Sequence, residues 1–383
     1  MYSTTKPAMP CGIDGIVRSR VMNRRHLLFG ATATAAAGTG LYLAGRGPSY
    51  PQAVAPLRTE LAAHSDTDMA YLVHHAVLAA NSHNTQPWLF RTGQRHIEIA
   101  PDRRRQTPVV DPDNHHLFAS LGCAAENLSL AALAAGANAN IAFVSNTAGL
   151  RVDLERTNPA RDPLFAAIRN RQCTRADYDG RDVDTANLTM LEQAAAVPGC
   201  RVSLLTEKPV VEKVLDLIVA ANSAQIEDPA FMRELKSWIR FNAASAVATG
   251  DGLYAACSGN PTLPTWLGTR LFDRVVTAEG ENAKCISQIR SAAGIAIFVS
   301  DANDPAHWVQ AGRSYQRFAL QATLLGIKHA FLNQPVEVAA FRPQLASLLG
   351  IGAKRPDLVV RFGYGPDMPM SMRRPLADVM TAL

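Results

Sequence analysis

Six hydrogen-bonding side chains follow one another between two apolar segments of this chain. They lie in the stretch AANSHNTQPWLF (79–90) and are Asn81, Ser82, His83, Asn84, Thr85 and Gln86. Asn, Ser and Thr side chains bond to nearby backbone groups and favour turns over helix. Because Asn and Gln both donate and accept hydrogen bonds, such a loop could bind a planar heterocycle. The alternative, favoured by composition alone, is an ordinary Asx turn before an edge strand.

A second polar group is basic. The run RNRQCTRADY (169–178) contains Arg169, Arg171 and Arg175 at the exit of a helix expected over 164–171. Three arginines in seven residues could lie on a solvated surface, as most runs of charged residues do. They could also bind a phosphate group, because guanidinium contacts phosphate oxygens in bidentate fashion. A further basic pair, Arg373–Arg374, precedes Pro375 near the end of the chain.

Composition indicates a globular protein. Of the 383 residues, 48% are hydrophobic and 19% charged, which suits one large domain or two ordinary ones. The net charge of +5 is concentrated in residues 1–46, where six basic residues face Asp14 alone. The remaining basic and acidic residues balance, so the pI of about 8.9 reflects the amino-terminal segment. We therefore expect no nucleic-acid partner.

The amino-terminal segment has the features of an export signal. Arg24–Arg25 precede the Ala- and Gly-rich run HLLFGATATAAAGTGLYLAG (26–45). This pattern resembles a twin-arginine signal, which implies the twin-arginine export machinery as a partner and a periplasmic or membrane-associated location. A membrane anchor is the alternative, although the Thr and Gly content is poor for one. We take residues 1–55 as the leader; cleavage after Ala55 would leave Pro56 next, so cleavage itself stays open.

Cysteine and histidine spacing gives no sign of a metal site. The six cysteines form no CxxC pair, and Cys123 and Cys200 are expected to be small core residues. The pairs His74–His75 and His115–His116 lack i,i+4 spacing, and adjacent helical residues point about 100° apart. We predict no metal ligand.

The periodicity of apolar residues predicts alternating helices and strands. In the first part of the chain we expect helices over 68–80 and 114–135, and strands over 88–92, 96–100, 141–144 and 150–154. In the second part we expect helices over 184–196, 304–325 and 338–349, and strands over 201–206, 294–300 and 357–363. Gly136 and Gly326 should end the two long helices.

The two long helices resemble each other. A shift of 190 residues places Gly122 on Gly312, Ala132 on Ala322 and Gly136 on Gly326. Two Ala-rich helices could look alike by chance, but the shared glycines favour an internal repeat. We therefore expect two halves, residues 56–156 and 157–383, with an insertion near 240–290.

These motifs together resemble the nitroreductase family of FMN-dependent flavoproteins. The loop resembles that family's PSSxNxQPW segment, although Ala80-Asn81-Ser82 replaces Pro-Ser-Ser. The run Arg171-Gln172-Cys173-Thr174-Arg175 resembles the RRSxR segment that holds FMN phosphate and ribitol. The strand 357–363, the Gly363-Tyr364 turn and the later basic pair resemble the family's ending, which also reaches the phosphate. With its leader, the chain most resembles the single-chain Acg family.

The resemblance implies an α+β fold, with a central mixed or antiparallel sheet flanked by helices in two fused nitroreductase-like halves. The family normally forms homodimers with two flavin sites. Here the first half lacks an RRSxR segment, and the second half has AAAVPGCRVSLL where the polar loop would be. The chain is therefore expected to act as a monomeric internal pseudo-dimer with one FMN site.

The resemblance also implies the site residues. The cofactor-binding residues would be Asn81, Ser82, Asn84, Gln86, Arg171, Cys173, Thr174, Arg175, Arg373 and Arg374. Cys173 replaces the usual Ser or Thr and is a weaker donor. No catalytic residue is assigned, because the flavin itself carries hydride at N5.

Two functions remain open from the sequence. The first is an FMN-dependent oxidoreductase that acts on a small-molecule acceptor, with NAD(P)H as a candidate donor; export would weaken that donor. The second is a protein that sequesters FMN under a lid without turnover. The segment 240–290, which has no counterpart in the family pattern, is one candidate for the lid.

Overall fold

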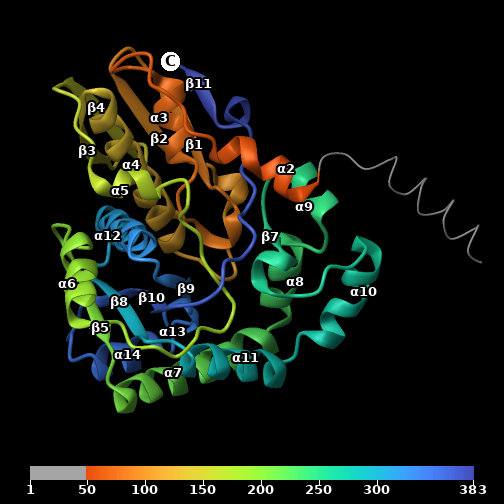
Figure 1. The fold of residues 1–383 in the computed structure, drawn as a ribbon. Helices are drawn as coiled ribbons and strands as arrows, with labels where there is room; N and C mark the ends of the chain where they lie inside the picture. The colour runs from red at the N-terminus through yellow and green to blue at the C-terminus, as the bar shows by residue number, and fades with distance from the viewer. Residues whose placement is uncertain (1–48) are drawn as a thin grey trace, which may run out of the picture. The chain divides into compact units, whose positions relative to one another are not determined.

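The same strand order occurs twice in the structure, a computed structural model that describes residues 49–383 (Figure 1). The first sheet has the order β1-β2-β4-β3, and the second has β5-β8-β10-β9. All neighbouring pairs within these two sets are antiparallel. The strands are β1 (Trp88–Thr92), β2 (His96–Pro101), β3 (Ala137–Val144), β4 (Gly149–Arg156), β5 (Cys200–Leu205), β8 (Gly294–Ser300), β9 (Lys328–Phe331) and β10 (Arg355–Gly363).

One strand crosses from the second half to the first. β11 (Met380–Ala382) runs parallel to β1, with Met380 opposite Phe90. The chain reaches it from β10 through residues 364–379, so the carboxyl end lies beside the first sheet (Figure 1). The first sheet is thus mixed and the second antiparallel, which confirms the predicted α+β class with two fused halves.

The helices that repeat between the halves are α4 (His115–Ala135) and α12 (Pro305–Leu324), and they agree with the predicted helices. Gly136 closes α4 with φ 95°, and Gly326 follows α12 with φ 69°. In the described residues α4 alone is long and apolar enough to cross a membrane, but 83% of its most apolar stretch is buried inside the protein. It is a core helix.

The remaining helices surround this frame or form the inserted segment (Figure 1). They are α2 (Tyr50–Val54), α3 (Met69–Ala76), α5 (Pro163–Ala167), α6 (Thr185–Ala194), α7 (Lys208–Glu227), α8 (Pro229–Trp238), α9 (Ala243–Thr249), α10 (Thr265–Val275), α11 (Ala278–Arg290), α13 (Gln334–Glu337) and α14 (Arg342–Leu348). A short parallel pair, β6 (Ile239–Arg240) and β7 (Leu253–Tyr254), lies within the insertion.

Three predicted helices differ from the observed ones, and one of them, expected over 164–171, ends at Ala167. The helix expected over 338–349 begins only at Arg342, because Pro343 fits the first turn of a helix but not its interior. The helix expected over 68–80 ends at Ala76, because the carbonyl groups that follow bond to a distant arginine. The twin-arginine motif and the apolar run of the predicted leader lie outside the described residues, whereas residues 49–55, also assigned to the leader, include α2 with Tyr50 and Val54 buried.

One hydrophobic core is shared by both halves. It includes Leu121 of α4, Phe318 of α12, Ile97 of β2 and Phe362 of β10. A smaller core under α7 and α11 covers the other face of the second sheet. All residues of β8 are therefore buried, which explains why GIAIFVS is continuously apolar. The halves cannot be separated without exposing the shared core.

The two repeated glycines bring α4 and α12 into close contact. A Cβ on Gly122 would overlap the carbonyl of Val309, and a Cβ on Gly312 would overlap the carbonyl of Ala119. These contacts are related by the same 190-residue shift as the sequence repeat. Each helix thus contacts the other through equivalent residues, as in the isologous interface of a homodimer.

Polar side chains repeat the same symmetry. The Glu126 carboxylate accepts a hydrogen bond from Arg317 Nη1 at 2.8 Å, and the side-chain oxygen Oδ1 of Asn127 accepts one from Gln316 Nε2 at 2.7 Å. The 190-residue shift places Glu126 on Gln316 and Asn127 on Arg317, so it maps the first pair onto the second. The internal pseudo-dimer therefore has an interface of reciprocal pairs.

We predict that Gly312→Ala destabilises the protein by about 3 kcal/mol, because the added methyl group overlaps α4 backbone at a crossing that cannot widen without opening the core. The measurement is the midpoint of urea unfolding. Gly280→Ala is the matched control, since Gly280 is exposed in α11 and alanine there should stabilise by up to about 1 kcal/mol. Equal midpoints for the two variants would contradict the close contact.

Candidate functional site

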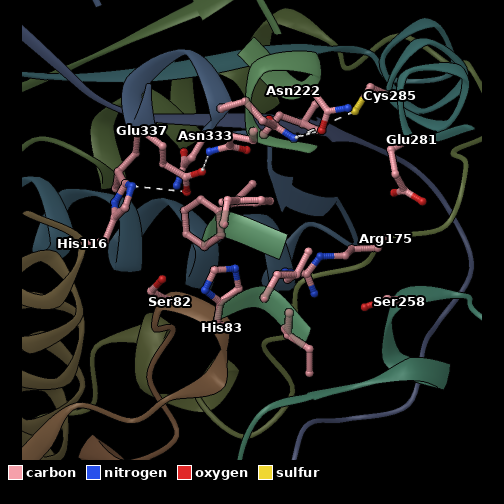
Figure 2. Close-up of a pocket in the computed structure, with 18 of the residues that line it drawn as sticks. Ser82, His83, His116, Arg175, Asn222, Ser258, Glu281, Cys285, Asn333 and Glu337 are labelled. Carbon is pink, nitrogen blue, oxygen red and sulfur yellow. Dashed lines mark hydrogen bonds and ion pairs between the residues drawn. The ribbon is translucent and has the colours of Figure 1, made fainter. Parts of the chain in front are cut away.

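A cavity of about 300 Å³ lies where the two halves meet the inserted helices (Figure 2). The polar loop contributes Asn81, Ser82 and His83, α4 contributes His116, and Tyr315 comes from α12. The opposite wall comes from α7, α8, α10, α11 and α13. This volume is at the lower end of the range for small-molecule sites, roughly 300–1,000 Å³.

The polar loop has an unusual backbone. His83, Asn84 and Gln86 have φ values of 47°, 53° and 54°, in the left-handed region. For a residue other than glycine, this conformation is less stable by roughly 1–2 kcal/mol. Strain of this size persists only where neighbouring groups fix the backbone, and it is concentrated at functional sites.

Gln86 is one of the groups that fix the loop. It is 0% exposed, and its backbone N–H donates to Asn81 Oδ1 at 2.8 Å. Its Nε2 donates to the Gly250 carbonyl at 2.8 Å, and its Oε1 accepts from the Arg374 backbone N–H at 2.8 Å. Gln86 therefore ties the loop to both the insertion and the carboxyl-terminal crossing segment, and it does not line the cavity.

Asn84 and Arg373 form a second attachment. Asn84 Nδ2 donates to the Gly252 carbonyl at 3.1 Å, and its Oδ1 accepts from Arg373 Nη1 at 2.9 Å. Arg373 is 4% exposed and also donates to the carbonyls that follow α3, those of Val77, Leu78 and Ala79. This bonding ends α3 early. It makes Asn84 and Arg373 supports of the loop.

Four arginines form a cluster without carboxylate partners. We define the arginine cluster as Arg58, Arg171, Arg175 and Arg373; within residues 49–383, none of them pairs with an acidic side chain. Burial and then the charge of Arg171 lower the pKa of Arg58 to about 9. Burial, Arg58 and Arg171 likewise hold the pKa of Arg373 well below its usual range. Such mutual repulsion is costly unless an anion is bound.

Unpartnered donors mark the same cluster. Arg58 Nε and Arg171 Nε are buried and have no hydrogen-bond partner in the described part of the chain. Arg58 Nη1 meanwhile donates to the Arg171 carbonyl at 3.3 Å, which brings the two residues together. Arg175 lines the cavity, and no described residue bonds to its guanidinium. The cluster thus reaches the cavity through Arg175.

Other predicted site residues lie elsewhere. The Thr174 hydroxyl donates to Gln172 Oε1 at 3.2 Å inside the protein. Arg374 pairs with Asp102 at 3.5 Å and lines a separate surface depression. Of the ten residues predicted to bind the cofactor, Asn81, Ser82 and Arg175 line the cavity, Arg171 and Arg373 join the arginine cluster, and Cys173 contacts Tyr315. The remaining four, Asn84, Gln86, Thr174 and Arg374, do not line the cavity, and their contact with the cofactor stays a prediction.

The two histidines of the pair at the start of α4 point to different places. His115 Nε2 lies 2.8 Å from Asp357 Oδ1 in the core, where burial raises the pKa of Asp357 to about 7. His116 instead faces Glu337 of α13 at 3.4 Å on the cavity wall (Figure 2). No group of three or more metal-ligating side chains occurs in residues 49–383.

His116 and Glu337 form a charged pair. Burial favours a neutral imidazole, but hydrogen bonding to Glu337 and nearby carboxylates outweigh it and raise the pKa of His116. Burial likewise opposes ionisation of Glu337, yet His116 lowers its pKa, and Gln225 Nε2 donates to it at 2.7 Å. An imidazole with a raised pKa therefore lies on the cavity wall, and only the HH dipeptide could have suggested it from the sequence.

His83 presents a neutral imidazole to the same space (Figure 2). Burial lowers its pKa to about 4, and its Nδ1 has no partner within the described chain. His83 belongs to the polar loop, but its residue type alone did not predict a site residue, and no sequence pattern predicted Arg58. Arg58 carries no motif, so its role follows only from its position.

Comparison with known proteins gives relatives of one kind. No protein-family model matches the chain. It is 23% identical over 320 residues to a putative NAD(P)H nitroreductase of Mycobacterium tuberculosis, covering 80% of this chain and 88% of that protein. It is 23% identical over 338 residues to the putative NAD(P)H nitroreductase acg of the same species, covering 80% and 93%. The predicted resemblance to the Acg group is confirmed by these relatives.

Solved structures with a partial likeness are also nitroreductases. A nitroreductase with bound FMN from Bacteroides fragilis is 15% identical, with a TM-score of 0.34, and covers 54% of this chain and 90% of that chain. The FMN-dependent nitroreductase NfnB from Mycobacterium smegmatis, in complex with NADPH, is 13% identical, with a TM-score of 0.39, and covers 57% and 97%.

We predict that Gln86→Ala lowers stability by about 1–3 kcal/mol for each buried group left unpaired, because the Gly250 carbonyl and the Arg374 N–H both lose their partner. The thermal unfolding midpoint measures the effect. Gln193→Ala, at an exposed position of α6, removes the same side chain and should leave the midpoint nearly unchanged. A Gln86→Ala midpoint equal to that of the control would show that the loop is not held in this way.

Proposed function

We propose that this chain is an FMN-dependent oxidoreductase of the nitroreductase type, with one FMN site between its two halves. The observation that carries the proposal is the arginine cluster, whose guanidinium groups lack carboxylate partners in residues 49–383 and which borders the cavity through Arg175. The names of the curated relatives support the reaction class. The absence of an RRSxR segment from the first half supports a single site.

The residues present fit the phosphate of FMN. A phosphate group is close to a dianion at neutral pH, and guanidinium groups bind its oxygens in bidentate fashion. The unpartnered Nε atoms of Arg58 and Arg171 supply donors that the protein itself does not use. Arg58, Arg171 and Arg175 would hold the phosphate, Arg373 would add its charge while its own donors stay bonded to the protein, and the cavity would hold the ring system.

When bound, FMN supplies hydride transfer through its N5 atom. The chain supplies position and electrostatics. The strained loop is fixed before any ligand binds. Ser82 and His83 therefore lose no further conformational entropy when they contact the ligand. The imidazole of His116, whose pKa is raised despite its burial, lies at the cavity wall and would be a proton source for a reduced acceptor.

The inserted segment would act as the lid. Leu253, Ser258, Phe272 and Lys284, all between residues 240 and 290, line the cavity. The carbonyls of Gly250 and Gly252, from the same segment, accept hydrogen bonds from the loop. The segment therefore both covers the cavity and stabilises its floor, and it would restrict the acceptor to a small molecule.

A second function is FMN sequestration without turnover, with the covered cavity as its supporting observation. Steady-state oxidation of NAD(P)H by the FMN-loaded protein, with a quinone or nitroaromatic acceptor, separates the two functions. Turnover supports the oxidoreductase with NAD(P)H as donor. Retained FMN with no turnover, using either NAD(P)H or dithionite as the donor, would favour sequestration.

Export and oligomeric state are proposals from the sequence alone. We propose that the twin-arginine machinery exports the chain to a periplasmic or membrane-associated location and that it works as a monomeric pseudo-dimer. Replacing Arg24 and Arg25 by lysine should leave the protein in the cytoplasm, as fractionation would show. A dimer by sedimentation would contradict the monomer.

We predict that Arg175→Ala weakens FMN binding about tenfold to a hundredfold, because a hydrogen bond to a charged group contributes about 1.5–3 kcal/mol. Its unfolding midpoint should stay unchanged, since no described residue bonds to its guanidinium. Flavin fluorescence titration measures the affinity. Arg233→Ala, an exposed arginine of α8, changes the net charge equally and is the control. Equal affinities in both variants would remove Arg175 from the site.

A further inference from the structure

Cys173 lies within the arginine cluster rather than in an apolar core. Its Sγ is 3.6 Å from Tyr315 Oη, and that hydroxyl is 3.2 Å from His329 Nδ1. Tyr315 belongs to α12 and His329 to β9, and both are fully buried, whereas Cys173 is partly exposed. Cys173 is therefore the least buried of these three contacting residues.

The surroundings favour the thiolate form. Burial opposes ionisation, but the neighbouring imidazole of His329, followed by the charges of Arg171 and Arg175, lowers the pKa of Cys173 to about 6. None of these strongest influences is a carboxylate. The titratable groups coupled to the thiol from its own segment and from the elements around it are Cys123, Arg171, Arg175, Tyr178, Tyr315, His329 and Arg373.

Two buried donors next to the thiol indicate that an additional anionic group belongs there. His329 is 1% exposed and Arg171 is 3% exposed. His329 Nε2 and Arg171 Nε each lack a hydrogen-bond partner in the described part of the chain. A buried donor left unpaired costs about 1–3 kcal/mol, so a ligand or a modified sulfur that accepts from it is stabilised.

The other described cysteines have the opposite environment. Burial raises the pKa of Cys200 to about 12 and that of Cys285 to about 11. Burial also raises the pKa of Cys123 and of Cys257. Because the thiolate is the nucleophile, these four should be inert at neutral pH and serve as internal controls.

We propose that Cys173 is a modification site, a nucleophilic thiol that reacts with hydroperoxides and similar electrophiles, and that its modification and phosphate binding in the arginine cluster exclude each other. The reactivity of the thiol rests on Cys173 and its neighbours alone. The mutual exclusion rests on the proposed function, because it requires the FMN phosphate to occupy the same cluster.

The reaction with a hydroperoxide is balanced. The thiolate sulfur attacks the terminal oxygen, an S–O bond forms and the O–O bond breaks. The leaving oxygen departs with the electron pair and takes a proton from water, so the peroxide is reduced to an alcohol or water. The sulfur is oxidised to sulfenic acid. The added oxygen atom lies among the donors that would otherwise bind phosphate.

The mutual exclusion has an electrostatic reason. A thiolate and a phosphate would both be anions within one group of guanidiniums, so each disfavours the other. A bound phosphate also shields the sulfur from reagents. Loading with FMN should therefore protect Cys173, and a modified Cys173 should prevent loading.

The first experiment is alkylation of the full-length apoprotein by iodoacetamide from pH 5 to 9, followed by peptide mass spectrometry. The thiolate attacks carbon and iodide leaves, so the rate reports the thiolate fraction. We expect Cys173 to react fastest, with a half-maximal rate near pH 6, and Cys200 and Cys285 to stay nearly unlabelled. Labelling of Cys173 no faster than that of Cys200 at pH 7 overturns the proposal.

Two variants give independent checks. Arg175→Ala removes a nearby charge without removing any bond described for its guanidinium, so the labelling profile of Cys173 should move to higher pH. Cys173→Ser identifies the labelled peptide by its absence. An unchanged profile in Arg175→Ala would show that the arginine cluster does not activate the thiol.

The second experiment adds FMN before alkylation and separates the two proposals. Slower labelling of Cys173 with FMN present, and loss of FMN binding after treatment with hydrogen peroxide, support the mutual exclusion. A reactive Cys173 in a protein that never binds FMN overturns the proposed function but not the reactive thiol. Bound FMN with Cys173 labelling at the rate of the apoprotein overturns the mutual exclusion.

Discussion

The close contact of α4 and α12 is the constraint on which the rest of the structure depends. Gly122 and Gly312 let the two backbones meet, and the reciprocal pairs Glu126–Arg317 and Asn127–Gln316 fix their register. The contact joins the two sheets to a single core. Because the cavity opens where α4, α12 and the inserted helices meet, its walls keep their positions only while this contact holds.

The arginines show how position decides the role of a residue type. Arg374 pairs with Asp102 and Arg373 donates to backbone carbonyls, so both stabilise the path of the chain around the polar loop. Arg58, Arg171 and Arg175 have no acidic partner within residues 49–383. Their repulsion and the strained loop are both unfavourable, and the surrounding core offsets both. These two costs at one place are the observations from which we infer a ligand-binding site there.

Much of the fold was predictable from periodicity. Strands β1 and β8 and helices α4 and α12 lie where the apolar patterns place them, because strand and helix periods are local properties. The loop and the RNRQCTRADY run were recognisable as candidate sites from residue type. Ser82 and Arg175 do reach the cavity. Asn84 and Gln86 do not, because partners more than 160 residues away in sequence use their hydrogen-bonding groups.

The sequence by itself determined the elements, the repeat with its two glycines, and the candidate polar and basic segments, since each depends on residue type and short-range spacing. Only the tertiary structure decided which polar groups remain unpaired. Arg58, His83 and the His116–Glu337 pair became site residues because distant elements place them at one cavity. The surroundings of Cys173 arise in the same way, because the fold brings Tyr315 of α12, His329 of β9, and Arg171 and Arg175 of the arginine cluster to one sulfur.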